Sequence, residues 1–285
     1  MGYHFWTFNL WGQNNVNVDS KIIIPGAAGL VGQNLIIQLK NRGFKNIVAI
    51  DKHYDNSKIL SQLHPDINFI DADLSCNPDK WSYCFKNAEC VIMLQAQIGA
   101  PSWEPFLNNT IKSSEYIIKA MKKYNVPYLI HVSSSVVNSV AKDYYTNSKK
   151  TQEAMVVNSG ISYCILRPTL MFGWFDRKHL GWLSRFMRKT PIFPIPGHGK
   201  YMRQPLYEKD FCKIIISAMN KKIENKIFDI TGRDEIDYID IIKLIKEVNN
   251  LKTLIVKIPY WLFYSLLEIY GIFSKNPPFT SQQLE

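Results

Sequence analysis

Two adjacent tyrosines and a lysine in the segment DYYTNSKK could carry out proton transfer. Tyr145 and Lys149 are four residues apart, so on a helix they would lie one turn apart on the same face. A phenol with an unperturbed pKa of about 10 is a poor base at neutral pH, but a nearby ammonium stabilises the phenolate and lowers that pKa. Tyr144 has Ser148 at the same spacing, which offers no charge. The spacing alone is also typical of two aromatic residues and a charge on an ordinary helix.

A glycine-rich segment, IIIPGAAGLVGQ, provides a second candidate site. Gly26, Gly29 and Gly32 follow a short run of β-branched residues and precede a pattern typical of a helix. Such a loop lets the backbone approach a pyrophosphate, which then lies at the helix N-terminus, here Leu30 and Val31. The spacing is G-x-x-G-x-x-G, and its position between a strand and a helix favours a dinucleotide site over a plain turn.

Acidic residues follow the next two predicted strands. Asp51, roughly 20 residues after the loop, could accept hydrogen bonds from ribose hydroxyls and would repel a 2′-phosphate, which favours NAD over NADP. Lys52 and His53 follow directly and weaken that preference. Asp73 could contact the adenine amine with Leu74 beside the ring, although an Asp at this place also suits a turn or a helix cap.

The elements that would position these residues alternate between strand and helix. Such alternation predicts parallel pairing with right-handed crossovers, and therefore an α/β fold with a doubly wound, Rossmann-type parallel sheet. After about residue 170 prolines and glycines gather in TPIFPIPGHG, which indicates a smaller lobe over the carboxyl edge of the sheet.

We expect a domain organisation of residues 1–20 as an extension of unknown role, 21–170 as the NAD-binding domain and 171–285 as mainly the substrate-binding lobe and C-terminal helices, some segments returning to the sheet. The expected strands are 21–25, 46–51, 67–74, 89–96, 128–135 and 162–169, and the expected helices are 29–43, 111–125 and 147–160.

Composition narrows the class of protein. The 285 residues, 46% hydrophobic and 20% charged, suffice for one large domain or a domain with a lobe. Five widely spread cysteines without a C-x-x-C spacing argue against a disulfide framework and against zinc, so we expect no metal and a reducing, cytoplasmic location.

The formal net charge of +10 is dispersed along the chain and accompanies no nucleic-acid-binding motif. We therefore expect no nucleic-acid partner; a basic cleft for a phosphorylated small molecule, or simply a solvated surface, fits the charge. No apolar run reaches 18 residues, so a membrane-spanning helix is not expected. The aromatic segment 259–273, PYWLFYSLLEIYGIF, suits a helix packed on the protein or an interfacial helix on a membrane.

Taken together, the motifs resemble the extended short-chain dehydrogenase/reductase family, the NAD-dependent epimerase/dehydratase group. The resemblance runs from about Lys21 to about Asp210 and depends on GAAGLVG, DADL, HVSSS, YTNSK, LRPTLMFG and RQPLYEKD. It implies that Tyr145 and Lys149 lie at the nicotinamide, that Lys149 bonds its ribose, and that Ser135, or else Ser134, holds the reacting oxygen. It also implies cofactor contacts by Gln95, Ala96 and Pro168, and a diphosphate contact by Arg203.

Three departures bear on the substrate. The family often has Ala-Ala where this chain has Gln95 and Ala96, and nucleotide-sugar members often have Asn where it has Leu170, which is closer to 3β-hydroxysteroid dehydrogenases. Val136 and Val137 stand where dehydratases of the family place an Asp-Glu pair, so a 4,6-dehydratase is not expected.

The sequence thus predicts an NAD-dependent oxidoreductase acting on a nucleotide-activated sugar, as a C4 epimerase or ketosugar reductase in surface polysaccharide synthesis. One alternative is a 3β-hydroxysteroid-dehydrogenase-like enzyme on a hydrophobic alcohol, and another is a non-catalytic dinucleotide-binding subunit. Peripheral membrane contact through 259–273 and a homodimer both stay open. Relatives usually extend past a segment like PPFTSQQLE, so we also expect a longer C-terminus.

Overall fold

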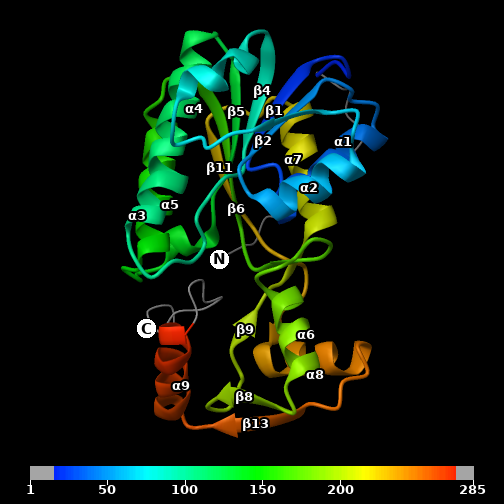
Figure 1. Cartoon of the computed structure of the whole chain (residues 1–285), viewed down its shortest axis with the longest axis vertical. Coiled ribbons are helices and arrows are strands. Elements are labelled where there is room, and N and C mark those ends of the chain that lie inside the picture. Colours follow the sequence, from blue (N-terminus) through cyan, green and yellow to red (C-terminus); the bar gives the residue numbers. More distant parts are fainter. Residues whose placement is uncertain (1–15, 274–285) are drawn as a thin grey trace, which may run out of the picture.

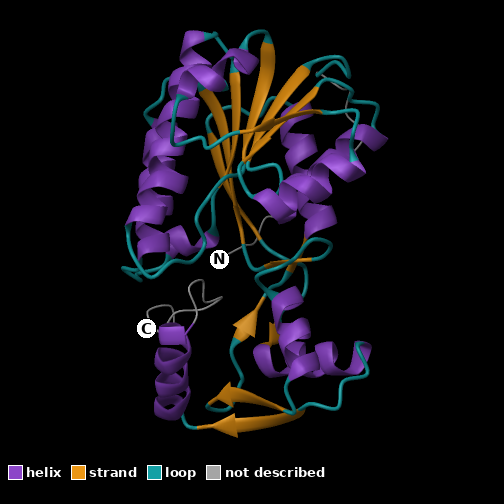
Figure 2. Cartoon of the chain, in the orientation of Figure 1, coloured by secondary structure: helices purple, strands orange, loops and turns teal. Residues whose placement is uncertain are grey.

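A computed structural model describes residues 16–273. The expected longer C-terminus lies outside this range, as does all but residues 16–20 of the expected N-terminal extension. Seven parallel strands form its central sheet, in the order β11-β6-β5-β4-β1-β2-β3 (Figure 2). The strand order reverses direction beside β1, as in a doubly wound sheet, so the predicted fold class is confirmed. The strands are β1 (Lys21–Pro25), β2 (Ile47–Asp51), β3 (Asn68–Asp71), β4 (Ala88–Met93), β5 (Tyr128–Val132), β6 (Ser162–Pro168) and β11 (Lys226–Ile230).

Helices cover both faces of this sheet because its strands carry apolar residues on both sides. On β1, Ile22 and Ile24 pack toward the face covered by α1, α2 and α7, whereas Ile23 packs toward the face covered by α4 and α5 (Figure 1). These helices are α1 (Leu30–Asn41), α2 (Tyr54–Leu63), α4 (Ser113–Lys123), α5 (Tyr144–Val157) and α7 (Glu208–Asn220).

An irregular helical segment leads into α4. The short helix α3 (Glu104–Phe106) continues into the π-helix η3 (Leu107–Lys112) before α4 begins. Ser113 and Ser114 donate their hydroxyls to the carbonyls of Asn109 and Thr110, at 2.8 and 2.6 Å, inside this widened turn. π-Helical turns are frequent at functional sites, and Asn109 in this one contacts Lys52, which directly follows β2.

A smaller lobe lies beyond the carboxyl ends of β6 and β11 (Figure 1). Its core joins α6, β8 and α8 through Leu183, Phe193 and Ile239. Between the two halves of the lobe the chain returns to the sheet to form α7 and β11, so the lobe is discontinuous in sequence. Its elements are β7 (Met171–Phe172), α6 (Leu180–Lys189), β8 (Ile192–Pro196), β9 (Met202–Arg203), β10 (Leu206–Tyr207), β12 (Ile236–Asp237), α8 (Tyr238–Val248), β13 (Leu254–Ile258) and α9 (Tyr260–Phe273).

Within residues 16–273, no helix has the length and apolar character needed to cross a membrane. All five cysteines lie in this range and are free thiols.

Candidate active site

The glycine loop joins β1 to α1 through a tight turn. Gly26 has a φ of +80°, and its N–H donates to the carbonyl of Ile50 on the neighbouring strand at 2.9 Å. A Cβ atom added at Gly26 would lie 2.5 Å from the backbone nitrogen of Gln95, so only glycine fits there. Gly29 is the N-cap of α1 and makes no side-chain cap, and the first turn holds no acidic residue. The first N–H groups of α1, at Leu30 and Val31, can therefore donate to an anion.

Asp51 anchors this loop from the end of β2. One carboxylate oxygen accepts from the N–H of Ala28 at 2.9 Å, and the other accepts from Lys52 and His53 at 2.8 and 2.9 Å. A carboxylate offers about four acceptor positions, so one is left for a ribose hydroxyl. The residue predicted to contact the ribose therefore also holds the loop in shape.

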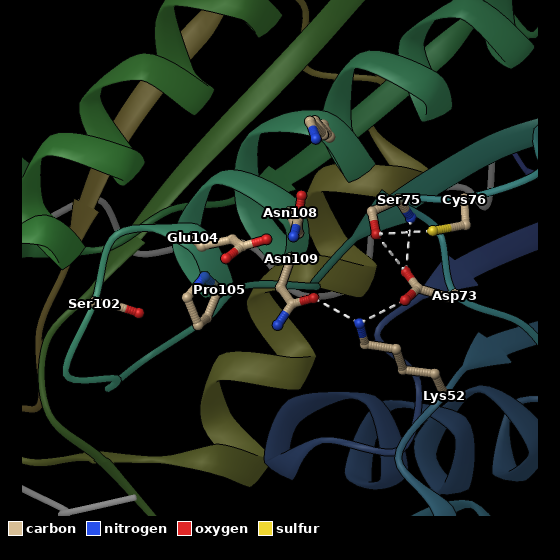
Figure 3. Close-up of a pocket in the computed structure, with 10 residues that line it drawn as sticks. Lys52, Asp73, Ser75, Cys76, Ser102, Glu104, Pro105, Asn108 and Asn109 are labelled. Carbon is tan, nitrogen blue, oxygen red and sulfur yellow. Dashed lines mark hydrogen bonds and ion pairs between the residues drawn. The ribbon is translucent and has the colours of Figure 1, made fainter. Parts of the chain in front are cut away.

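A pocket of about 530 Å³ opens beside Asp51, between the segments that follow β2 and β3 and the π-helix (Figure 3). Lys52 extends across it and donates to Asp73 at 2.9 Å and to Asn109 at 2.6 Å. Burial alone would raise the pKa of Asp73, but hydrogen bonds from Ser75 and Lys52 outweigh that effect and lower it. The volume of the pocket lies within the range of small-molecule sites, and Lys52 is already paired with Asp73 inside it.

The two tyrosines have different surroundings. Asp143 caps α5, with one carboxylate oxygen accepting from the N–H groups of Tyr145 and Thr146 at 2.9 and 3.1 Å. The helix therefore begins at Tyr144, three residues earlier than expected, and it includes both tyrosines. The ring of Tyr144 packs against Trp103 and Phe106, with centroids 5.8 and 5.9 Å away, which gives it a packing role.

Tyr145 is half-buried and hydrogen-bonds with Ser134 at the end of β5. Desolvation raises the pKa of Tyr145, the Ser134 hydrogen bond opposes this, and the Asp143 charge adds to the rise. The contact comes from Ser134 and not from Ser135, because Ser134 ends the extended segment whereas Ser135 begins the 3-10 helix η4 (Ser135–Asn138). The family resemblance implies Ser135, or else Ser134, for the reacting oxygen, and the hydrogen bond to Tyr145 comes from the second of these.

Lys149 lies one turn along α5 from Tyr145 and is only 1% exposed. Its Nζ donates to the carbonyl of Val132 at 3.0 Å and to Oε1 of Gln152 at 2.5 Å. Burial lowers the pKa of Lys149 to about 7, and the charge of Glu153 opposes that shift. An ammonium has three donors, so one N–H can serve a ligand.

The remaining predicted residues fall into two places. Leu74, Gln95, Ala96 and Pro168 all lie at or just beyond the carboxyl ends of their strands, on the same edge as the glycine loop. Arg203 lies apart from them, exposed on β9 of the lobe, and its Nη1 donates to the carbonyl of Met202. The fold thus collects the residues predicted to bind the cofactor and to transfer the proton at one edge, and it leaves Arg203 on the lobe.

The sequence motifs do not indicate Asn109, Ser114 or Gln152 as site residues. Asn109 contacts Lys52 because the π-helix places Asn109 beside the pocket, and no local sequence pattern predicts a π-helix there. Gln152 follows Lys149 by three residues, a spacing that places both on one helix face and could have indicated the contact.

The chain is similar to known proteins, both in sequence and in structure. The model of the NAD dependent epimerase/dehydratase family matches residues 22–231. The mouse sterol-4-alpha-carboxylate 3-dehydrogenase (decarboxylating) is 23% identical over 287 residues, covering 89% of this chain and 75% of that protein.

Two solved structures share the fold. A UDP-glucuronic acid 4-epimerase from Bacillus cereus in complex with NAD superposes with a TM-score of 0.70 at 22% identity, covering 83% of this chain and 87% of the other. A UDP-glucose 4-epimerase from Thermotoga maritima with UDP-glucose gives a TM-score of 0.72 at 19% identity, covering 84% and 85%. The family match spans more than half of the chain and includes both the glycine loop and the Tyr145–Lys149 helix, so this chain belongs to the NAD-dependent epimerase/dehydratase family, as its motifs indicated.

Proposed function

We propose that the chain is an NAD-dependent oxidoreductase acting on a nucleotide-activated sugar, as a C4 epimerase or ketosugar reductase in surface polysaccharide synthesis. The observation that carries the redox part is the convergence of Tyr145, Ser134 and Lys149 at the sheet edge that also holds the glycine loop. A non-catalytic dinucleotide-binding subunit would have no need of this arrangement.

In this proposal Tyr145 moves the proton while bound NAD supplies a hydride acceptor. Without a ligand Tyr145 is the neutral phenol, and the positive charge of a bound nicotinamide would favour its phenolate. When a secondary alcohol is oxidised, its hydroxyl proton would pass to that phenolate and its C–H hydrogen would leave with two electrons as hydride. Ser134 orients the phenol, Ser135 holds the substrate oxygen, and Lys149 binds the nicotinamide ribose. Return of the hydride to the opposite face gives an epimer, whereas use of external reduced cofactor gives net ketone reduction.

Asp51 should determine the choice between NAD and NADP. We expect NAD to bind at least about ten times more tightly than NADP, a gap of roughly 1.4 kcal/mol, because the carboxylate would repel a 2′-phosphate. Lys52 does not offset this, since its ammonium is paired with Asp73. Asp51→Ala should weaken both ligands by loosening the loop, but it should narrow the ratio between them, as measured by calorimetry. Tighter binding of NADP to the parent protein would contradict the assignment.

Arg203 supports the choice of a nucleotide sugar. Its neighbours in the chain are tied to the end of β6: the Gln204 carbonyl accepts from Thr169 Oγ1 at 2.7 Å, and the Leu206 N–H donates to the Leu170 carbonyl at 2.8 Å. Arg203 is thus one residue from a segment fixed at the carboxyl edge of the sheet. An exposed guanidinium there can donate two parallel hydrogen bonds to a diphosphate.

The expected result with UDP follows from that position. At millimolar concentration UDP, or a UDP-sugar, should raise the melting temperature of the NAD-loaded protein, since a ligand stabilises the state that binds it. Arg203→Ala should remove most of that shift and leave the NAD shift intact; Arg203→Lys, which keeps the charge without the planar fork, should restore it only in part. An unchanged UDP shift in Arg203→Ala would remove Arg203 from the substrate site.

A hydrophobic alcohol is the second candidate substrate, favoured by Leu170 and by the sterol-acting relative. This candidate would be preferred if no nucleoside diphosphate raises the melting temperature of the protein while a sterol-type alcohol does. Identifying the nucleotides released when the purified protein is denatured separates the candidates further, because an epimerase of this type would be expected to retain NAD through turnover.

We also propose that residues 259–273 make peripheral contact with a membrane. The apolar residues Tyr260, Trp261, Leu266 and Ile269 of α9 are exposed, and exposed Lys252 and Lys257 precede them. Aromatic and basic side chains together suit a negatively charged lipid surface.

The protein should therefore cosediment with vesicles of anionic phospholipid on centrifugation. Trp261→Ser should reduce the fraction of protein that cosediments several-fold. Trp174→Ser is the matched control, because Trp174 is equally exposed, at 69%, and lies outside α9. Equal binding by the parent and both variants would exclude α9 as the contact.

A further inference from the structure

Two buried polar side chains and a half-buried one form a group that contacts Lys149 through Gln152. We call it the buried amide cluster, and it consists of Gln95, Ser114 and Gln152, which follow β4 or belong to α4 and α5. Ser114 and Gln152 are completely buried. Polar groups in such a place are costly unless their hydrogen bonds are satisfied, so the direction of each bond is informative.

The single proton of Ser114 sets the orientation of both amides. Its hydroxyl donates to the Thr110 carbonyl at 2.6 Å, so towards the glutamines its oxygen can only accept. It accepts from Nε2 of Gln152 at 2.8 Å and from Nε2 of Gln95 at 3.1 Å. Nε2 of Gln152 also donates to the backbone carbonyl of Gln95 at 3.3 Å. With its amide nitrogen held in this way, Gln152 must direct its oxygen at Lys149.

Lys149 is held by neutral oxygens, those of Gln152 and the Val132 carbonyl. The acidic group whose charge acts on Lys149 is Glu153 on the same helix, and its two oxygens accept from Arg167 at 2.9 and 2.7 Å. The ammonium therefore has no carboxylate bonded to it among the described residues, and Gln152 makes its shorter hydrogen bond.

Two other titratable groups face Lys149. His131 on β5 is completely buried, and desolvation together with the charge of Lys149 lowers its pKa well below the usual value, so its ring is neutral at working pH. Tyr145, one turn away, is neutral until its raised pKa is reached. Neither group supplies the negative charge that would otherwise hold the ammonium.

We propose that Gln152 is a positioning residue for Lys149: its amide oxygen, oriented by Ser114 and the Gln95 carbonyl, holds the ammonium where a cofactor ribose is bound. This inference rests on the proposed function, in which Lys149 binds the nicotinamide ribose. The same cluster reaches the glycine loop, because the backbone of Gln95 packs directly on Gly26. One buried unit thus fixes both the loop and the lysine.

The pH dependence of NADH binding, followed by NADH fluorescence, separates positioning from mere packing. Affinity for the parent protein should fall as pH rises through the pKa of Lys149 at about 7, since the neutral amine loses its charge-assisted bond to the ribose. Gln152→Glu places a carboxylate beside the ammonium and should move this midpoint up by about one pH unit or more. Gln152→Leu removes the acceptor and should move it down by about the same amount.

Two further variants make the result decisive. Lys149→Met should bind NADH weakly, and its affinity should show no midpoint near pH 7. Gln38→Leu is the matched control, since Gln38 is a buried glutamine on α1 that donates to the Lys209 carbonyl at 2.8 Å, and its midpoint should equal that of the parent. If Gln152→Leu fails to fold, the upward shift of the pH midpoint in Gln152→Glu is sufficient to test the role of Gln152.

The outcomes distinguish this inference from the proposed function. If the parent binds NADH, Lys149→Met loses the midpoint and both Gln152 variants retain the parent's midpoint, the role of Gln152 is overturned while the function stands. A downward shift in Gln152→Glu overturns it as well. If the parent binds no NADH, the proposed function fails, and the inference that rests on it fails with it.

Discussion

Replacing Tyr145 by phenylalanine is expected to reduce turnover by roughly a hundredfold or more, the usual scale for loss of a general acid or base. The phenol is held by Ser134 and lies one turn from Lys149, so the substitution removes the group that would exchange a proton with the substrate. The ring itself remains, and cofactor affinity should stay within about twofold of the parent. Steady-state kinetics and NADH titration of the same preparation measure the two effects.

Tyr144→Phe is the matched control for this substitution. Tyr144 is adjacent in sequence and chemically identical, but its ring packs on Trp103 and Phe106, and those contacts do not need the hydroxyl. Its turnover should therefore stay close to that of the parent. Equal activity of the two variants would show that Tyr145 is not the proton donor.

Gly26→Ala should lower cofactor affinity by a hundredfold or more and also destabilise the protein. The alanine would have to keep a φ of +80°, at a cost of about 1–3 kcal/mol, and its Cβ would overlap the backbone of Gln95. Because backbone atoms cannot rotate away as a side chain can, the loop itself must move, and the N–H groups at the start of α1 move with it.

Gly160→Ala separates these two causes. Gly160 has a similar φ of +75°, but an added Cβ would meet no atom within 4 Å. Denaturant unfolding should therefore show a loss limited to the backbone strain, and NAD affinity should be unchanged. If both variants lost the same stability and Gly26→Ala still bound NAD normally, the close packing of the loop on Gln95 would have no role in cofactor binding.

The parts of the fold that sequence predicts are those encoded in short stretches. The glycine loop, the buried strands and the apolar face of α1 each follow from residues within one element and its turn. The predicted ends were less accurate: the third and fourth strands were expected to reach Leu74 and Ala96 but end at Asp71 and Met93. Asp51 ends β2 and pairs with Asp71, so the neighbouring strand and not the local sequence ends β3.

The lobe and the buried contacts depend on residues far apart in sequence. Strand β9 has two residues and pairs with β12, more than thirty positions later, a contact that no local pattern can show. Gln95, Ser114 and Gln152 meet only after three separate elements have packed, so their common role cannot be predicted from any one of them. The order of the serines was ambiguous for a similar reason, since the start of η4 decides which hydroxyl meets Tyr145.

The interleaving of lobe and sheet has a consequence for recombining this protein with its relatives. A fragment ending at residue 170 would lack β11, the edge strand that pairs with β6, and α7, which packs against α1. Strand β6 would then become the sheet edge, and an apolar face would be left bare. The complementary fragment would carry α7 and β11 with no sheet to join. A single crossover at that boundary would therefore exchange α7 and β11 together with the lobe, and the relative's α7 and β11 would have to pack on this chain's α1 and β6. Exchange of the lobe alone would require two separate segments, about 171–207 and 231–273, while α7 and β11 between them stay with the sheet.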